Sequence, residues 1–170
     1  FDFNFEVCVS DNGSQADVHS LVKKYNQDLD IVFNQNESNL GLGVNILKSV
    51  SLAKGEFVWI LGNDDLLLPD TFFHLNKLLK IDGDIDFFYI NSFHIDYKVV
   101  LKPNQTFNTK ELPKNMEKFS LYPKSFKTNF LNLVNHKISF DFILGMFLAI
   151  FRKKIWDANL FRINQDFLKD

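Results

Sequence analysis

The stretch Gly55-Glu56-Phe57-Val58-Trp59-Ile60-Leu61-Gly62-Asn63-Asp64-Asp65 places an acidic turn directly after a continuous apolar run. The run from Phe57 to Leu61 is bounded by turn residues, a pattern that predicts a short strand buried on both faces. Two adjacent carboxylates are unfavourable unless something neutralises them, and a hard divalent cation does so through oxygen ligands. A solvated turn whose aspartates cap the next helix fits this local sequence equally well.

The residues before this stretch alternate between strand and helix patterns. Residues 3–9 alternate in polarity with a period of two, and Asp30–Phe33 forms a second short apolar run, so both predict strands. A helix is expected between them, opened by a capping box at Ser14 and Asp17 and ending near Asn26. A second helix is expected around the apolar stripe Val44, Leu47 and Val50, with Gly55 as its C-cap.

The residues after the acidic turn continue the same alternation. Pro69-Asp70 opens another predicted helix, and Ile85–Ile90 predicts a further strand. This order favours an α/β fold, a mostly parallel sheet with helices on both faces. Because ligands of such sheets bind at the carboxyl ends of strands, the loops Asp11–Ser14 and Asn63–Asp65 are the candidate binding loops.

The second half of the chain is less regular. Residues 92–124 contain three of the four prolines and predict a long excursion from the sheet. A helix is expected over Ser125–Val134 with Phe126 facing inward, and a strand over Ile143–Phe151. The basic residues Arg152–Lys154 are then expected to form the solvent-exposed end of that strand.

Composition excludes several classes of protein. The 170 residues fit one domain, and the formal net charge of −2 argues against nucleic acid as a partner. Cys8 is the single cysteine and cannot form an internal disulfide, which favours a reducing compartment. The longest apolar stretch, Phe142–Phe151, is too short to span a bilayer. A strand pattern begins almost at residue 1 without Met, and the chain ends in a polar run, so we expect a fragment of a longer protein.

Two further polar segments need an interpretation. The Asp11–Ser14 turn can accept hydrogen bonds from a base or a ribose, although it is also simply a good turn. The segment Asn39–Asn45 contains Gly-x-Gly, but Ile46 stands where the dinucleotide fingerprint needs its third glycine, which excludes that reading. Asn39 and Asn45 are expected to organise the loop by local hydrogen bonds or to cap the helix.

Taken together, the motifs resemble glycosyltransferase family 2 in its GT-A fold. The segment Glu6–Ser14 is similar to the family's second strand and acidic turn, and Asn39-x-Gly41 with Asn45 is similar to its Asn-x-Gly segment. Ala53–Leu61 followed by Asn63-Asp64-Asp65 and Pro69 resembles its Ala-x-Gly-Glu strand, Asp-x-Asp loop and following proline. The later Phe151–Trp156 is similar to a stretch of the abequosyltransferase-like branch.

The resemblance implies transfer of a sugar, with inversion, from a nucleotide-diphosphate sugar to the hydroxyl of a saccharide or lipid-linked acceptor in cell-surface polysaccharide synthesis. By position, Asp11 would contact the base, Asn63 and Asp64 would lie along the ribose and diphosphate, and Asp65 would ligate Mn²⁺ or Mg²⁺. A later carboxylate would be the general base. We favour Asp166 because it follows the late strand in a polar turn, and the other candidates are Asp141, Asp157 and Asp170. Residues 1–91 would bind the donor and residues 92–170 the acceptor, in the cytoplasm or peripherally at the inner face of the membrane.

The sequence also departs from the family pattern. Asn63 replaces the first aspartate of the metal loop, which removes one negative charge, and Asn12 replaces the second acid of the earlier turn. The family's first strand and helix have no counterpart in these residues. Two alternatives therefore stay open: a non-catalytic or truncated nucleotide-sugar-binding relative, and a generic α/β regulatory domain.

Overall fold

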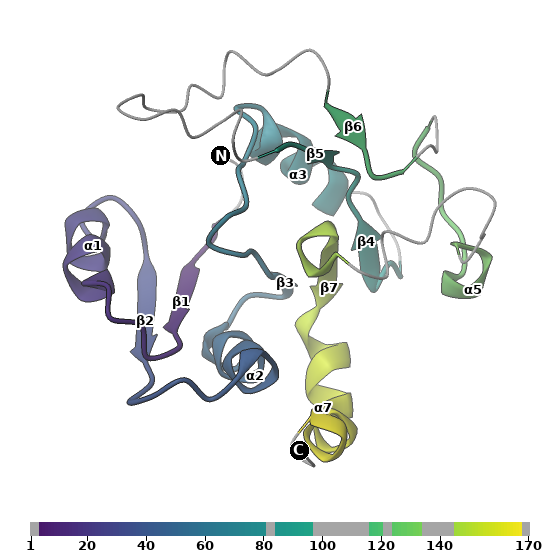
Figure 1. Ribbon diagram of the computed structural model, residues 1–170. Coiled ribbons are helices and arrows are strands. Elements are labelled where there is room, and N and C mark those ends of the chain that lie inside the picture. The colour runs from purple at the N-terminus through teal and green to yellow at the C-terminus, as the bar shows by residue number, and fades with distance from the viewer. Residues whose placement is uncertain (1–3, 81–83, 97–115, 121–123, 134–144, 168–170) are drawn as a thin grey trace. The chain divides into compact units, whose positions relative to one another are not determined.

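The computed structural model describes residues 4–80, 84–96, 116–120, 124–133 and 145–167, and Figure 1 shows their helices and strands. The chain divides into two compact units. The first contains residues 1–60 together with 151–170, and the second contains residues 61–150. The first unit is therefore built from two segments that are far apart in the sequence.

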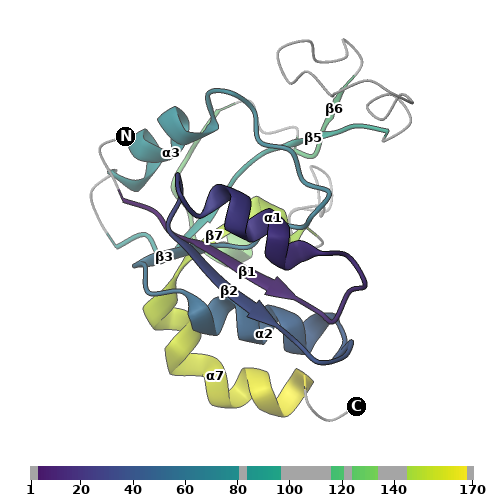
Figure 2. The ribbon, with the colours of Figure 1, turned by 90° about the vertical axis from the view of Figure 1, so that its left-hand side faces the viewer.

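The centre of the first unit is a pair of parallel strands. Strand β1 (Val7–Asp11) pairs with β2 (Ile31–Gln35), so that Asp11 lies opposite Gln35 at the carboxyl ends of both strands. Helix α1 (Val18–Tyr25) connects them, and helix α2 (Leu42–Leu52) follows β2. Figures 1 and 2 show α1 and α2 on opposite faces of the pair, which is the arrangement predicted from the alternating pattern.

Helix α1 begins differently from the prediction. Its N-cap is Asp17, whose carboxylate accepts a hydrogen bond from Ser20 N at 3.0 Å. Ser14 is not the cap, and its backbone N–H donates to Asp11 Oδ1 at 3.2 Å. The capping box was wrong because the Asp17 side chain, not that of Ser14, accepts from a free N–H in the first turn of the helix, that of Ser20.

The connection from α2 to the third strand also differs from the prediction. The C-cap of α2 is Ala53 in an extended conformation, not Gly55. Glu6 Oε1 accepts hydrogen bonds from Lys54 N at 2.6 Å and Gly55 N at 2.8 Å, so a side chain from before β1 fixes this turn. Strand β3 (Phe57–Trp59) follows, and only its central residue, Val58, is buried.

The basic residues that were expected to end a strand in solvent instead lead into a helix that was not predicted from the sequence. Strand β7 (Ala149–Arg152) passes directly into helix α7 (Lys153–Phe167). Arg152 forms an ion pair with Glu56 and lies over the Phe57 ring, 4.5 Å from its centroid. Phe151 stacks on Trp156 with the ring centroids 5.3 Å apart. The contacts of Arg152 join the returning segment to the start of β3. Helix α7 runs beside α2 in both views (Figures 1 and 2).

The second unit contains α3 (Thr71–Leu79) and β4 (Phe87–Tyr89), close to their predicted places. Its buried apolar residues in the described part are Leu75, Phe88, Leu148 and Ile150. Strands β5 (Phe93–His94) and β6 (Glu117–Lys118) pair antiparallel within the predicted excursion, of which residues 97–115 and 121–123 lie outside the described residues. Helix α5 is only Phe130–Leu133, with Phe126 outside it and 53% exposed, so the longer inward-facing helix was wrong. A short 3₁₀ turn, η1 (Met146–Leu148), precedes β7.

Two glycines with left-handed backbone angles allow a matched test of the first unit. Gly13 has φ of 71°, and a Cβ there would lie 2.6 Å from the backbone carbon of Ser38. Gly41 has φ of 84°, but a Cβ there would meet nothing within 4 Å. We expect Gly41→Ala to lower the free energy of unfolding by about 1–3 kcal/mol from backbone strain alone, and Gly13→Ala to lower it by more. Urea unfolding measures both, and equal losses would contradict the close approach of the two loops at Gly13.

Candidate functional site

Polar side chains gather where β1 and β2 end. Asp11, the last residue of β1, is only 9% exposed. Its Oδ1 accepts from Ser14 N and its Oδ2 accepts from Gln35 Nε2 at 2.9 Å. Hydrogen bonds from Ser14, and then from Gln35, hold the pKa of this carboxyl below its ordinary value against the opposing effect of burial. The carboxylate is therefore ionised and joins the turn after β1 to the end of β2.

Asn12 connects that turn to the loop before α2. Its Oδ1 accepts from Leu40 N at 3.0 Å, and its Nδ2 donates to Asn39 Oδ1 at 2.8 Å. Asn39 Oδ1 also accepts from Gly41 N at 2.9 Å, which confirms the prediction that Asn39 organises its loop locally. The alternative role, capping of the helix, is not seen, because the N-cap of α2 is Gly41 and no side chain caps it.

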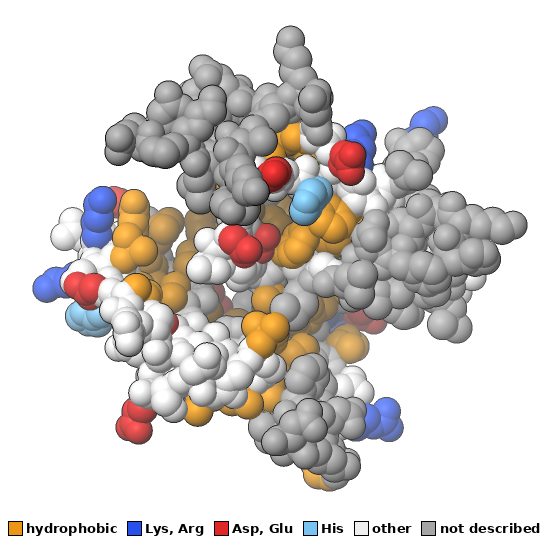
Figure 3. Space-filling model, viewed as in Figure 1, with side chains coloured by type: hydrophobic (Ala, Val, Ile, Leu, Met, Phe, Trp, Pro, Cys, Tyr) orange, Lys and Arg blue, Asp and Glu red, His pale blue; other side chains and the backbone are white. Residues whose placement is uncertain are grey.

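Asn45 joins helix α2 to the end of β1. Its Nδ2 donates to Ser10 O at 3.0 Å, and its Oδ1 accepts from the Ser10 hydroxyl at 2.7 Å. Each amide in this region therefore bonds across elements that are far apart in the sequence. On the face shown in Figure 3, uncharged side chains and backbone predominate over the loops that follow β2 and lead into α2.

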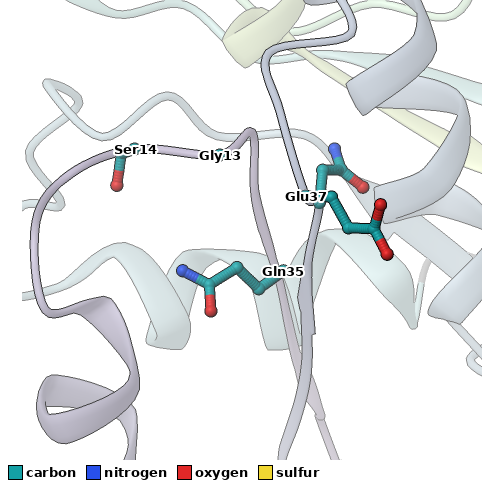
Figure 4. A pocket seen from close by; sticks show the side chains of 5 residues that line it. Gly13, Ser14, Gln35 and Glu37 are labelled. Carbon is teal, nitrogen blue, oxygen red and sulfur yellow. The ribbon is translucent and has the colours of Figure 1, made fainter.

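An open hollow of about 320 Å³ lies beside these loops, lined by Gly13, Ser14, Gln35, Asn36 and Glu37. Figure 4 shows Gln35 pointing toward the side where Ser14 lies, while the Glu37 side chain extends the opposite way. Amide, hydroxyl and carboxylate groups of this kind can bind ring nitrogens and sugar hydroxyls. Gln35, Asn36 and Glu37 were not identified from the sequence as site residues, since nothing in their spacing indicates that they lie near the Asp11 turn.

The acidic loop after β3 belongs to the second unit from Leu61 onward. Asp65 Oδ2 accepts from the backbone N–H of Gly62 at 2.5 Å. A Cβ built on Gly62 would lie 2.6 Å from Asp64 Oδ1 and 3.2 Å from Asp65 Oδ2. Both carboxylates therefore turn back over the same glycine. Because Gly62 has no side chain, a small space remains beside the two carboxylates, which we call the Gly62 cradle.

The electrostatics of the loop agree with this geometry. Burial raises the pKa of Asp65, the hydrogen bond from Gly62 lowers it, and the neighbouring charge of Asp64 raises it again. Asn63 and Asp64 are exposed. The alternative reading, in which these aspartates cap the next helix, is not seen, because Asp70 occupies the N-cap of α3.

The donor atoms in this loop suit a cation that is shared with a ligand. Within the described ranges no group of three or more His, Cys, Asp or Glu side chains is arranged to hold a metal ion. Two carboxylates over one cradle nevertheless match Mg²⁺, which proteins often bind through about one or two carboxylates together with substrate phosphates. The residues present therefore fit a metal whose remaining ligands come from a substrate.

The candidate general bases are placed in different ways. The backbone of Asp166 lies in the last turn of α7, so the polar turn assumed for it was wrong. Asp157, also in α7, accepts two hydrogen bonds from Lys153 Nζ, at 2.8 and 2.9 Å. Asp141 and Asp170 lie outside the described residues.

Comparison with known proteins gives one family and several relatives. The family model described as glycosyl transferase family 2 matches residues 1–157. An abequosyltransferase of Salmonella typhimurium is 37% identical over 87 residues, which are 50% of this chain and 26% of that protein. An uncharacterized glycosyltransferase of Methanocaldococcus jannaschii is 35% identical over 96 residues, 56% of this chain and 33% of that protein.

A third relative, a glycosyltransferase of Mycoplasma pneumoniae also described as uncharacterized, is 32% identical over 85 residues, 48% of this chain and 27% of that protein. The matched part of the chain thus spans about a quarter to a third of these curated relatives. No solved structure is a significant match.

The depressed pKa of Asp11 predicts a pH dependence of stability. A carboxyl whose pKa is lower in the folded protein stabilises the fold at pH values above its ordinary pKa of about 3.9. This contribution is lost as the pH falls through the lower pKa of the folded state.

Gln35→Met removes one donor to Asp11 at similar volume, so the pKa of Asp11 should rise toward its ordinary value in a carboxyl-detected NMR titration. Gln27→Met, at an exposed glutamine of the same unit, should leave it unchanged. An unaltered Asp11 titration in Gln35→Met would remove the role given to Gln35.

Proposed function

The chain belongs to glycosyl transferase family 2, and from that premise we propose that the protein transfers a sugar from a nucleotide-diphosphate donor to an acceptor hydroxyl with inversion. The observation that carries the proposal is the polar hollow at the carboxyl ends of two parallel strands, lined by side chains that suit a nucleoside. Ligands of open α/β sheets bind at such ends, so the position and the chemistry agree.

The donor nucleoside would occupy this hollow. Asp11 would contact the base, or would position Ser14 and Gln35, which donate hydrogen bonds to it, so that they contact the base. Asn63 and Asp64, both exposed, would meet the ribose and the diphosphate. An amide oxygen at Asn63 still accepts a hydrogen bond from a ribose hydroxyl, although it brings no charge.

Asp65 would hold Mn²⁺ or Mg²⁺, with Asp64 as its neighbour over the Gly62 cradle. When bound, the cation supplies charge stabilisation for the diphosphate as it leaves. Burial disfavours the ionised form of Asp65 and so raises its pKa, and a bound cation would offset that effect.

The chemistry would be a single displacement. The acceptor hydroxyl oxygen forms a bond to the anomeric carbon while its proton passes to a carboxylate. The bond from that carbon to the diphosphate oxygen breaks, and the diphosphate leaves with the electron pair. Asp166 remains our proposed base on its position late in the chain, and residues 92–170 are the proposed acceptor side.

The biological setting is proposed from similarity. One relative is named an abequosyltransferase, and we propose a saccharide or lipid-linked acceptor in cell-surface polysaccharide synthesis, at the cytoplasmic face of a membrane. Among the helices of the described residues, none combines the length and the apolar character needed to cross a bilayer.

A thermal-shift screen tests donor and metal binding together. The nucleoside diphosphates UDP, GDP, CDP and dTDP, with and without Mn²⁺, should include one that stabilises the protein, by about 2.7 kcal/mol at a hundred times its dissociation constant. Asp65→Ala should abolish the Mn²⁺-dependent part of the shift, whereas Asp70→Ala, at a nearby exposed aspartate that makes no cap hydrogen bond, should keep it. No response of the wild-type chain to any of the four would count against the proposed function, and an intact Mn²⁺ effect in Asp65→Ala would remove that ligand.

The cradle at Gly62 gives a second test that leaves both carboxylates in place. Gly62→Ala would put a methyl group 2.6 Å from Asp64 Oδ1, so the carboxylates must separate and Mn²⁺ affinity should fall about tenfold or more. Gly55→Ala is the matched control, because its nearest neighbour would be 3.4 Å away. Mn²⁺ titration followed by electron paramagnetic resonance measures both, in the presence of the stabilising diphosphate. Equal affinities would show that the metal does not use the space over Gly62.

A further inference from the structure

Asn36 follows β2 and is a buried polar residue, with only 4% of its surface exposed. A buried amide must be hydrogen-bonded, since each group left without a partner costs about 1–3 kcal/mol. The side chain of asparagine can donate two hydrogen bonds and accept two. Asn36 uses all four, and its backbone N–H also donates to Asp11 O at 2.9 Å.

The four side-chain bonds divide evenly between the two ends of the amide. Oδ1 accepts from Lys48 Nζ at 2.8 Å and from Asn34 Nδ2 at 3.1 Å. Nδ2 donates to Asn12 Oδ1 and to Asn45 Oδ1, both at 3.1 Å. One amide therefore contacts the turn after β1, the end of β2 and helix α2.

The orientation of this amide is fixed by groups that can act in only one sense. The Lys48 ammonium has donors and no acceptor, so it requires the oxygen of Asn36. The backbone N–H of Leu40 is likewise only a donor, and it requires the oxygen of Asn12. Because Lys48 fixes the oxygen of Asn36 and Leu40 fixes the oxygen of Asn12, the NH₂ group of Asn36 must face Asn12 Oδ1. If the Asn36 amide were flipped, its NH₂ group would face the donor group of Lys48.

We propose that Asn36, oriented by Lys48, is a positioning residue for the donor nucleotide. It holds the turn at Asn12 against the end of β2 and anchors both to Asn45 of α2. The hollow lies between that turn and the residues after β2, and Asn36 itself helps to line it. The inference rests on the proposed function, because it assigns the residue that prepares the nucleoside site before the ligand arrives. Such preparation lowers the ordering that binding would otherwise require.

The test is calorimetric titration of the full chain with the diphosphate that stabilises it best among UDP, GDP, CDP and dTDP. Asn36→Asp keeps the shape of the side chain but places an acceptor against Asn12 and Asn45. The dissociation constant should rise about tenfold, while the fitted stoichiometry stays that of the wild type. A merely structural role would lower the stoichiometry, because fewer molecules would be folded, and would leave the dissociation constant unchanged. Asn4→Asp, an exposed position in the same unit, controls for the added charge.

Lys48 provides a second pair of variants in case Asn36→Asp does not fold. Lys48→Met keeps the side-chain stem and removes the donor that orients Asn36, so it should also raise the dissociation constant. Lys48→Arg keeps a donor-only group and should remain within about twofold of wild type. Wild-type affinity in both Asn36→Asp and Lys48→Met overturns this inference alone, and so does a loss confined to the stoichiometry. If the wild-type chain binds none of the four diphosphates, the proposed function itself fails.

Discussion

Backbone pairing of β1 and β2 ends with the bond from Asn36 N to Asp11 O, and beyond that point side-chain hydrogen bonds must hold the chain. This constraint governs the first unit, since a turn and a loop without regular pairing have to form a defined surface. Asparagine side chains and one aspartate hold these segments in place, because each of them can form hydrogen bonds with more than one partner. Asn12, Asn36 and Asn45 each contact segments from different parts of the sequence. Buried networks of this kind specify one arrangement only when every member is satisfied.

Much of the fold could be predicted, because apolar periodicity directly reflects burial. The β1–β2 pair, α2 and α3 all lie close to the predicted ranges. The errors occur where a distant residue decides the local structure. Gly55 does not cap α2, since Glu6 binds the turn instead, and the strand expected to end in solvent at Arg152 passes into α7 beside Glu56. Sequence periodicity carries no signal for a partner that lies tens of residues away.

The candidate site shows the same division. The acidic loop and the Asp11 turn were visible because unusual residues follow strands, and the roles given to them stay predictions. Asn36 and Lys48 were not visible, because an asparagine in a polar loop and a lysine on a helix are ordinary when read alone. Asn12 had been read only as a departure from an acidic pattern. Its Nδ2 donates to both Asn39 Oδ1 and Gly41 O, which no carboxylate could do.

The ion pair between Arg152 and Glu56 joins residues 96 positions apart. A ribosome adding about 5–20 residues per second needs on the order of 5–20 s to cover that interval. Throughout it, Glu56 and Phe57 have been synthesised while the guanidinium that later contacts them does not yet exist. The whole of residues 61–150 is made before the returning segment exists. The first unit, which needs residues 151–170 as well as residues 1–60, can therefore be completed only after the whole of the second unit has been made.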